Sequence, residues 1–326
     1  MKICIIGAGA MGGLYGGRLI MAGQEVSFVD SRQDVVDNIN QNGLHVTGID
    51  GEHRIPGRAS IDAADFEPVD IAFIQTDTNN TGNAALHAQK VLSADNGWAI
   101  TFQNGIGNVE TLQDVLGPAR VVGGISYHSA ASQAPGHSNH TNAGRTFIGE
   151  LNGATTGRIR QLDELLTGAG FNVTIAKDIE SVIWSKFVLN CAVNPISAIT
   201  GLRTGEIGTS ESARVFQQGI LDEVLEVVRA RGISLGDMDP RATVEGFTGR
   251  LFNRPSMLQH MDAGLATEID SLNGAVVREG QALGVDTPFN EALTLLVKAR
   301  NAHVIQALHG PAIDYEALEA SARNNP

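Results

Sequence analysis

Three polar side chains suited to proton transfer and substrate binding recur at helical spacing in the second half of the chain. Lys186, Asn190 and Asn194 stand at i, i+4 and i+8, so on a helix they fall within one narrow stripe. Apolar neighbours such as Trp184 and Phe187 favour an enclosed helix over a solvated one. Burial disfavours the charged form of a lysine, which brings its proton affinity toward the range useful for a general acid.

Polar residues also gather at two predicted helix starts, in Arg254-Pro-Ser256 and in Thr267-Glu268-Ile-Asp270. Taken alone, each group is typical of an ordinary helix N-terminus. A third group, Gln103-Asn104-Gly105, ends a predicted parallel strand at the edge where ligands bind in open α/β sheets. An ordinary Asn-Gly turn is the simpler interpretation of that segment.

The first thirty residues predict a dinucleotide-binding unit. An apolar strand runs into a G-x-G-x-x-G loop that opens a predicted helix over residues 10–22. The first glycine permits a tight turn, the second lets the backbone approach a pyrophosphate, and the third allows close helix packing. The phosphates then lie at the helix N-terminus. The residues assigned to the cofactor on this basis are Gly7, Gly9, Ala10, Met11 and Gly12. The alternative is a tight turn with nothing bound.

Asp30 ends the next predicted strand, about 20 residues after the loop. Its carboxylate can accept hydrogen bonds from both ribose hydroxyls of an adenosine and would repel a 2′-phosphate. NAD(H) is therefore favoured over NADP(H). Arg32 keeps NADP(H) open, because its guanidinium is near enough in sequence to reach a 2′-phosphate. It can equally be a solvated surface residue or stack on the adenine.

The composition is typical of a globular protein with room for two domains. Of 326 residues, 42% are hydrophobic and 18% are charged. The formal net charge of -13 comes from scattered acidic residues, which argues against nucleic acid and anionic membranes and favours a small-molecule partner. Cys4 and Cys191 are expected to be buried, reduced thiols. With no leader peptide or long apolar run in the sequence, we expect a cytoplasmic protein.

Three histidines, His128, His137 and His140, lie in a predicted loop and hairpin without a cysteine or carboxylate at metal-ligand spacing. We therefore expect surface histidines and no metal site. Cys191 follows Asn190 but points about 100° away around the helix, so an unreactive thiol is expected rather than a nucleophile.

Strand-like and helix-like segments alternate through the first half, which predicts a parallel sheet with helices on both faces. The predicted strands are Ile3–Ile6, Glu25–Val29, Leu44–Thr47, Ile71–Gln75, Trp98–Gln103 and Val121–Ile125. Residues 136–141 and 145–149 predict a hairpin, followed by a helix near 157–166 and a strand at 172–175. We expect these segments to extend the edge of the sheet.

The pattern is helical from Ile179 onward. Apolar periodicity is clearest in Val182–Leu189, Ile220–Arg231, Ile269–Leu283 and Ala292–Leu308. The expected fold is α/β: a Rossmann-type doubly wound parallel sheet over residues 1–177 and a second, all-helical domain over 178–326. Asp178 or Ser181 would cap the first helix, and a substrate would meet the nicotinamide in the cleft between the domains. The long apolar helix faces are interpreted either as domain core or as a homodimer surface.

Taken together, these motifs resemble the ketopantoate reductase family (2-dehydropantoate 2-reductases), and the resemblance covers nearly the whole chain. Besides the glycine loop, it is carried by Gln103-Asn104-Gly105, Trp184-Ser-Lys186 through Asn190 and Asn194, Ala198-Ile-Thr-Gly201, Pro255-Ser256-Met-Leu-Gln259, Thr267-Glu268-Ile-Asp270-Ser-Leu-Asn273-Gly274 and Gly284-Val-Asp-Thr-Pro288-Phe-Asn290.

The resemblance implies reduction of the 2-oxo group of ketopantoate to pantoate by hydride transfer from a nicotinamide, a step in pantothenate biosynthesis. By position, Lys186 would be the general acid. Glu268 would hydrogen-bond the substrate hydroxyl or Lys186 and also lie at the cofactor. Ser256 would hold the substrate carboxylate. Cofactor and substrate would be oriented by Asn104, Asn190 and Asn194.

The chain departs from the family pattern in two ways. Asp30-Ser31 stands where NADPH-dependent members carry a basic residue, which bears on the cofactor. Differences at Asp77, His260 and Leu265 bear on the substrate. Relatives with the same lysine reduce other branched or aromatic 2-oxo acids with NADH, so a D-2-hydroxyacid dehydrogenase is the main alternative. A non-catalytic dinucleotide sensor is disfavoured, because a sensor has no need of a lysine, two amides and a carboxylate at the nicotinamide.

Overall fold

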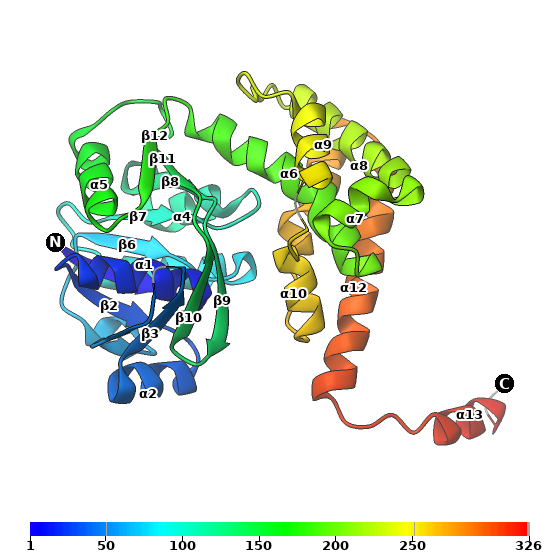
Figure 1. Cartoon of the computed structure of the whole chain (residues 1–326), viewed down its shortest axis with the longest axis horizontal. Helices are drawn as coiled ribbons and strands as arrows, with labels where there is room; N and C mark the ends of the chain where they lie inside the picture. The colour runs from blue at the N-terminus through cyan, green and yellow to red at the C-terminus, as the bar shows by residue number, and fades with distance from the viewer. Residues whose placement is uncertain (50, 251, 325–326) are drawn as a thin grey trace. The chain divides into compact units, whose positions relative to one another are not determined.

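The computed structural model describes residues 1–49, 51–250 and 252–324. The chain divides into two compact units, which are described separately (Figure 1). The first unit comprises residues 1–188 and 232–238, and the second comprises residues 189–231 and those from 239 on.

The first unit is built on an eight-stranded sheet of order β12-β11-β8-β7-β6-β1-β2-β5. Neighbouring strands are parallel except β11, which runs antiparallel to β8. The strands are β1 Lys2–Ile6, β2 Glu25–Val29, β5 Ala59–Ser60, β6 Ile71–Ile74, β7 Trp98–Thr101, β8 Val121–Ser126, β11 Arg145–Gly149 and β12 Asn172–Ile175. The predicted Rossmann-type parallel sheet is confirmed.

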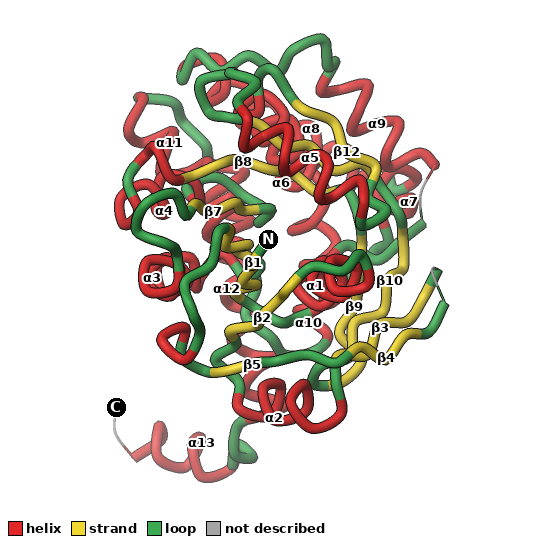
Figure 2. Tube along the Cα trace, turned by 90° about the vertical axis from the view of Figure 1, so that its left-hand side faces the viewer, coloured by secondary structure: helices red, strands yellow, loops and turns green. Residues whose placement is uncertain are grey.

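Helices cover both faces of this sheet, because successive side chains of a buried strand point to opposite faces. In β1, Ile3 and Ile5 belong to the core that includes α1 and α5, whereas Cys4 and Ile6 belong to the core that includes α3 and α4. Figure 2 shows α3 and α4 on one side of the strands and α1 on the other. The helices are α1 Ala10–Met21, α2 Gln33–Asn42, α3 Thr81–Val91, α4 Asn108–Leu116 and α5 Gly157–Gly168, with short 3-10 turns at Ala63–Asp65, Thr78–Asn80 and Pro118–Arg120.

A second sheet, of order β4-β3-β10-β9, packs against α1. Its strands are β3 Leu44–Gly48, β4 His53–Ile55, β9 Ser129–Ala134 and β10 His137–Asn142. Because α1 lies between two sheets, it is rich in glycine: a Cβ on Gly17 would come within 2.7 Å of Val46 Cγ2.

The second sheet corrects two predictions. Residues 136–141 and 145–149 do not form a hairpin, since β10 pairs with β3 and β9 while β11 pairs with β8 and β12. Leu44–Thr47 is a strand but does not belong to the large parallel sheet, because the free edge of β2 is taken by β5 through the Phe28–Ala59 pair.

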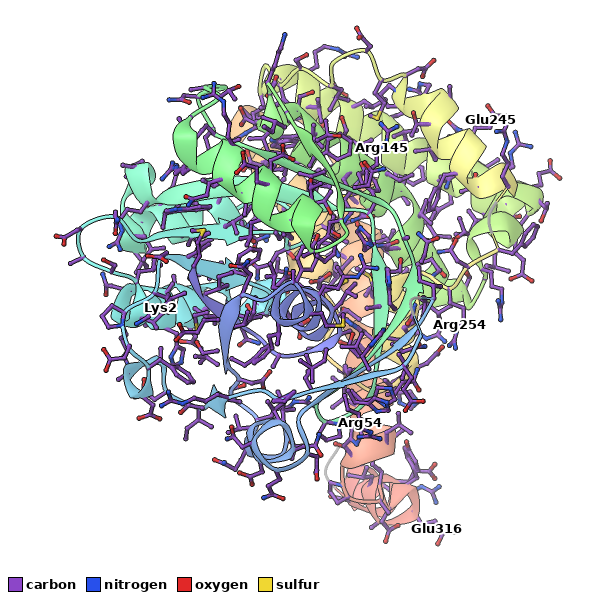
Figure 3. The ribbon with its side chains drawn as sticks, turned by 60° about the vertical axis from the view of Figure 1, so that its left-hand side comes forward. Lys2, Arg54, Arg145, Glu245, Arg254 and Glu316 are labelled. Carbon is purple, nitrogen blue, oxygen red and sulfur yellow. The ribbon has the colours of Figure 1, made fainter. Side chains whose placement is uncertain are left out.

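The second unit contains no strand among its described residues, which confirms the predicted all-helical part. It contains the second half of α6 (Ile179–Thr200). The helices that follow are α7 Thr204–Thr209, α8 Glu211–Ala230, α9 Pro240–Arg250, α10 Ser256–Asp262, α11 Asn273–Leu283, α12 Pro288–His309 and α13 Tyr315–Asn324. Exposed carboxylates such as Glu245 of α9 and Glu316 of α13 point outward (Figure 3).

The core of the second unit joins α8, α11 and α12 through a chain of buried polar groups. The carboxylate of Glu223 accepts hydrogen bonds from the backbone N–H groups of Phe289 and Asn290, at 2.8 and 2.9 Å, where α12 begins. Asn273 Nδ2 donates to Asn290 Oδ1 at 2.9 Å. The predicted helix Ile269–Leu283 is broken here: a 3-10 turn over Ile269–Ser271 precedes α11, and Leu272 between them has φ -108° and ψ -105°, outside the helical range.

Helix α6 is shared by the two units, which divide between Val188 and Leu189. The predicted boundary at residue 178 lies at the start of this helix, where Asp178 Oδ1 accepts the Ser181 N–H at 3.0 Å as an N-terminal cap. By length and composition α6 could cross a membrane, but 61% of its most apolar window is buried inside the structure. Such burial is typical of a core helix.

Candidate active site

The carboxyl end of β1 leads into the glycine loop. Gly7 has φ 97°, a left-handed conformation that favours glycine. Gly12 packs so closely that a Cβ there would collide with the carbonyl oxygen of Gly7, whereas a Cβ on Gly9 would meet nothing within 4 Å. Gly9 precedes α1, whose first turn, with Ala10 and Met11, has no side-chain cap. The loop therefore fits a pyrophosphate, which needs an open backbone and uncapped N–H groups at a helix N-terminus.

Asp30 is held against this loop. Its Oδ2 accepts the Ala8 N–H at 2.8 Å, and its Oδ1 accepts the Arg32 N–H at 3.0 Å. The Asp30 side chain is 11% exposed and the Arg32 side chain 54%, with Arg32 Nε 3.9 Å from Asp30 Oδ1. A fixed negative charge thus lies where the adenosine ribose of a bound dinucleotide would be recognised.

Gln103 ties together the carboxyl ends of β6 and β7. It is buried, its Oε1 accepts from Thr101 Oγ1 at 2.9 Å, and its Nε2 donates to Thr76 O at 2.9 Å. These bonds fix the backbone that presents Asn104, whose carbonyl accepts from Asn108 Nδ2 at 2.9 Å. At the end of β6, Gln75 Nε2 is buried without a hydrogen-bond partner in the described part of the chain. An unsatisfied buried donor at this edge also fits a ligand with oxygen acceptors.

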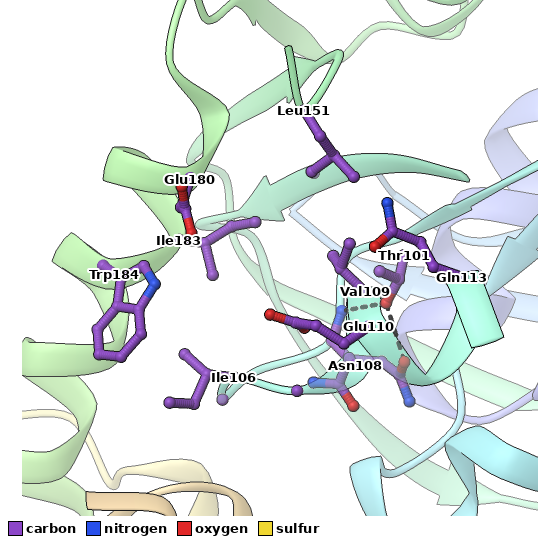
Figure 4. Close-up of a pocket in the computed structure, with 14 residues that line it drawn as sticks. Thr101, Ile106, Asn108, Val109, Glu110, Gln113, Leu151, Glu180, Ile183 and Trp184 are labelled. Carbon is purple, nitrogen blue, oxygen red and sulfur yellow. Dashed lines mark hydrogen bonds between the residues drawn. The ribbon is translucent and has the colours of Figure 1, made fainter. Parts of the chain in front are cut away.

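A cavity of about 190 Å³ opens beside this loop. Figure 4 shows Ile106 and Glu110, from the loop and the start of α4, facing Ile183 and Trp184 of α6. Its wall mixes apolar side chains with amides and carboxylates, the composition of a small-molecule site. All of its lining residues belong to the first unit.

The side chain of Lys186, a residue of α6, reaches the same edge of the sheet at the carboxyl end of β8. Its Nζ donates to the carbonyl oxygen of Ser126 at 2.6 Å and lies 5.4 Å from the centroid of the Tyr127 ring. Burial raises the pKa of Tyr127, so this ring stays neutral near the ammonium group. The lysine is therefore fixed by the protein at this edge rather than extended into bulk water.

The other predicted substrate residues belong to the second unit. Asn190 and Asn194 follow Lys186 on α6 at successive turns, and Asn194 is buried. Ser256 is the first residue of α10, and Glu268 directly precedes the 3-10 turn before α11; both are partly buried. The predicted residues therefore divide between the units: the glycine loop, Asp30, Asn104 and Lys186 belong to the first unit, and the other four belong to the second.

The expectation of surface histidines is wrong for two of the three. His140 is fully buried because it lies in β10, which packs against α1, and His128, between β8 and β9, is 8% exposed. His137, on the partly exposed face of β10, instead stacks on His45 with a centroid distance of 3.9 Å. Among the described residues, no three His, Cys, Asp or Glu side chains are grouped to hold a metal ion.

Both thiols are buried, as predicted. Burial raises the pKa of Cys4 to about 12 and that of Cys191 well above its ordinary value, so neither thiol is a nucleophile. Ser126, Tyr127 and Gln75 were not predicted as site residues from the sequence. The signal that could have found them is the one used for Asn104, namely a position at the carboxyl end of a parallel strand.

Comparison with known proteins decides the family. The family model Ketopantoate reductase PanE/ApbA matches residues 3–153, and the model of its C-terminal domain matches residues 178–301. The chain belongs to the ketopantoate reductase family. It is 31% identical over 298 residues to the 2-dehydropantoate 2-reductase of Archaeoglobus fulgidus, covering 91% of this chain and 97% of that protein.

Solved structures agree with this assignment. The PanE/ApbA family ketopantoate reductase from Ralstonia eutropha JMP134 has a TM-score of 0.86 at 30% identity, covering 93% of this chain and 99% of that chain. A D-mandelate dehydrogenase solved with NADH and anilino(oxo)acetate also has a TM-score of 0.86, at 25% identity and the same coverage of 93% and 99%. The resemblance seen in the sequence is confirmed, and this ketopantoate reductase family member is an oxidoreductase.

Two glycines of the loop have different roles, since Gly9 faces open space and Gly12 is tightly packed. We expect Gly9→Ala to leave the melting temperature unchanged, because its methyl group enters open space, and to weaken NADH binding tenfold or more, roughly the effect of a lost close approach. Gly12→Ala should lower the free energy of unfolding by about 2 kcal/mol through overpacking. Thermal melts and NADH fluorescence titration measure both effects. Unchanged NADH affinity in Gly9→Ala would contradict binding at this loop.

Proposed function

We propose that the protein reduces the 2-oxo group of ketopantoate to the hydroxyl group of pantoate, with Lys186 as the proton donor. The observation that carries this proposal is the Lys186 ammonium group fixed on Ser126 O, at the same sheet edge as the open glycine loop. The family membership and the cavity beside Asn104 support a small 2-oxo acid as substrate.

The reaction adds a hydride to C2 of the 2-oxo acid and a proton to its oxygen. When bound, the reduced nicotinamide supplies the hydride. The Lys186 ammonium stabilises the negative charge that develops on the carbonyl oxygen and then donates one Nζ proton to it. Ser126 O accepts a hydrogen bond from a second Nζ–H group, which fixes the directions of the other N–H groups. Lysine regains its proton from water after product release.

The remaining roles complete the proposal. Ser256 holds the substrate carboxylate, and Glu268 accepts a hydrogen bond from the substrate hydroxyl or from Lys186 and contacts the cofactor. The amides of Asn104, Asn190 and Asn194 orient substrate and cofactor. Their donors and acceptors suit an α-oxo acid, which offers oxygen atoms at both the carbonyl and the carboxylate.

The substrate is tested with a panel of ketopantoate, pyruvate, 2-oxoisovalerate and phenylglyoxylate, each with NADH and with NADPH. We expect the highest kcat/KM with ketopantoate. Preference for phenylglyoxylate would indicate a D-2-hydroxyacid dehydrogenase instead.

The lysine is tested with Lys186→Ala, for which we expect kcat to fall by roughly 10³-fold through loss of the acid and of charge stabilisation.

Lys186→Arg is the matched control for this lysine. A guanidinium keeps the positive charge but does not release a proton. Lys186→Arg should therefore recover the part of kcat that depends on positive charge. The part that depends on proton donation should stay lost. Wild-type kcat in Lys186→Ala would rule out the assignment.

For the cofactor, we propose that NADH is preferred and that NADPH is used poorly. The support is Asp30, whose carboxylate is locked beside the loop by the Ala8 and Arg32 N–H groups. A 2′-phosphate bound there would meet this fixed negative charge.

Asp30→Ala should narrow the ratio of kcat/KM for NADH over NADPH, because it removes the repulsion. Asp37→Ala, which removes one exposed carboxylate from α2, serves as the control and should leave the ratio unchanged. The ratio is measured by steady-state kinetics with both cofactors. Equal kcat/KM values for the two cofactors in the wild-type protein would refute the preference.

We also propose a cytoplasmic homodimer. The buried thiols suit a reducing compartment. On α12, Leu295 and Leu296 are 61% and 54% exposed and share one helix face with the exposed Ala292 and Ala299. A second copy would cover this face, and a monomeric mass by light scattering would contradict it.

A further inference from the structure

The chain passes between the two sheets of the first unit directly beside Lys186. β8 ends at Ser126 and β9 begins at Ser129, so Tyr127 and His128 form the whole outward crossing. The return crossing, between β10 and β11, includes Gly144. The two crossings touch, because a Cβ on Gly144 would collide with the carbonyl oxygen of Tyr127. Any movement of the outward crossing would therefore displace the backbone that holds the lysine.

A buried histidine pair spans this joint. His128 Nδ1 lies 3.1 Å from His140 Nε2, which also lies 3.0 Å from the carbonyl oxygen of Asn142. On the other side, Arg18 Nη2 lies 3.5 Å from His140 Nδ1. Arg18 is itself fixed, since its Nη1 donates to Gly170 O at 3.0 Å. A histidine of the outward crossing is thus tied to β10 of the second sheet and, through it, to α1.

The neighbours of His140 determine where the protons lie. A guanidinium can only donate, so His140 Nδ1 is the acceptor facing Arg18. A carbonyl can only accept, so His140 Nε2 carries the proton that faces Asn142 O and His128. His128 Nδ1 must then be an acceptor. The hydrogen bonds therefore run in one direction, from Arg18 to His140 to His128.

This pair is coupled to the residue that holds the lysine. The backbone N–H of His128 donates to Ser126 Oγ at 3.3 Å, while Ser126 O accepts from Lys186 Nζ at 2.6 Å. Tyr15 hydrogen-bonds Ser126 and Thr146 from the α1 side, and burial raises the pKa of Tyr15 to about 12, so it remains a phenol. Ser126 is therefore held by His128 of the outward crossing, by its pairing with Thr146 of β11 and by Tyr15 of α1.

We propose that His128 and His140, oriented by Arg18, are positioning residues that hold the Ser126 carbonyl in place for the ammonium group of Lys186. This inference rests on the proposed role of Lys186 as proton donor. The histidines touch neither substrate nor cofactor in this account. They act by keeping the crossing at Tyr127 in one conformation, so that the lysine amine has a fixed acceptor.

The test compares two substitutions of similar size, one of which keeps a hydrogen-bond acceptor while the other is apolar. His128→Asn places an amide oxygen near the position of Nδ1 and keeps the acceptor, whereas His128→Leu removes it. We expect kcat in His128→Leu to fall by roughly tenfold to a hundredfold, the scale for misplaced catalytic groups. KM for NADH should stay within about twofold, since the glycine loop is untouched. His128→Asn should restore most of the rate.

His137→Leu is the matched control, because it removes a histidine from the same strand, β10, that stacks on His45 outside the pair. It should leave kcat unchanged. His140→Gln keeps a donor near the position of Nε2 and should also retain most of the rate. Thermal melts of every variant establish that each is folded before its rate is compared.

A readout independent of turnover is the titration of Lys186 itself, followed by NMR of 13C-dimethylated lysines and assigned with Lys186→Arg. A carbonyl acceptor favours the charged form of an amine. In His128→Leu the titration of Lys186 should therefore move to lower pH, as should the basic limb of the kcat profile. It should not move in His128→Asn.

The two proposals fail in different ways. A wild-type protein inactive on every 2-oxo acid would reject the proposed function, while the lysine titration would still decide the positioning role. Identical lysine titrations and identical kcat values in His128→Leu and His128→Asn would overturn the positioning role, even in an active enzyme. Equal losses in His128→Leu and His137→Leu would also overturn it.

Discussion

The parallel pairing of β1, β2, β6, β7 and β8 is the constraint on which the rest of the first unit depends. Parallel strands end at one edge, so the residues that follow them must meet there. The glycine loop follows β1, Asp30 follows β2, and Gln103 and Ser126 lie at the ends of β7 and β8. The uncapped N-terminus of α1 adds positive potential at the same edge, which suits anionic phosphates.

Rigid hydrogen bonding holds this edge in place. The Gln103 side chain binds the ends of two strands, and the Asp30 carboxylate accepts the backbone N–H of Ala8 in the glycine loop and that of Arg32. Buried polar networks are costly when they are incomplete, so they specify one geometry when all members are satisfied. An enzyme that must align a hydride donor, a carbonyl carbon and an ammonium group gains from such fixed groups, because misalignment lowers the rate steeply.

Much of the fold could be predicted from the sequence, because local patterns determine it. The glycine loop, Asp30 and the buried strands are signalled by spacing and hydrophobicity within short windows. Two strands of the second sheet, at 44–47 and 136–141, were predicted, but their pairing was missed, since β10 pairs with β3 some ninety residues away.

The same limit applies to the site. His137 and His140 look alike in sequence, but only the packing of α1 between two sheets buries one of them. The contact between Lys186 and Ser126 joins residues 60 positions apart, so spacing cannot reveal it. The roles of Ser256 and Glu268 stay predictions, because they rest on the family resemblance and not on a local pattern.

The one-way order of the Arg18, His140 and His128 hydrogen bonds has a consequence for proton supply. A guanidinium does not give up its proton near neutral pH, so the head of this chain is a dead end for a Grotthuss-type relay. These three side chains therefore cannot pass a proton from Arg18 toward the lysine. In the proposed mechanism the lysine regains its proton from water, so solvent deuterium would report on the refilling of the amine.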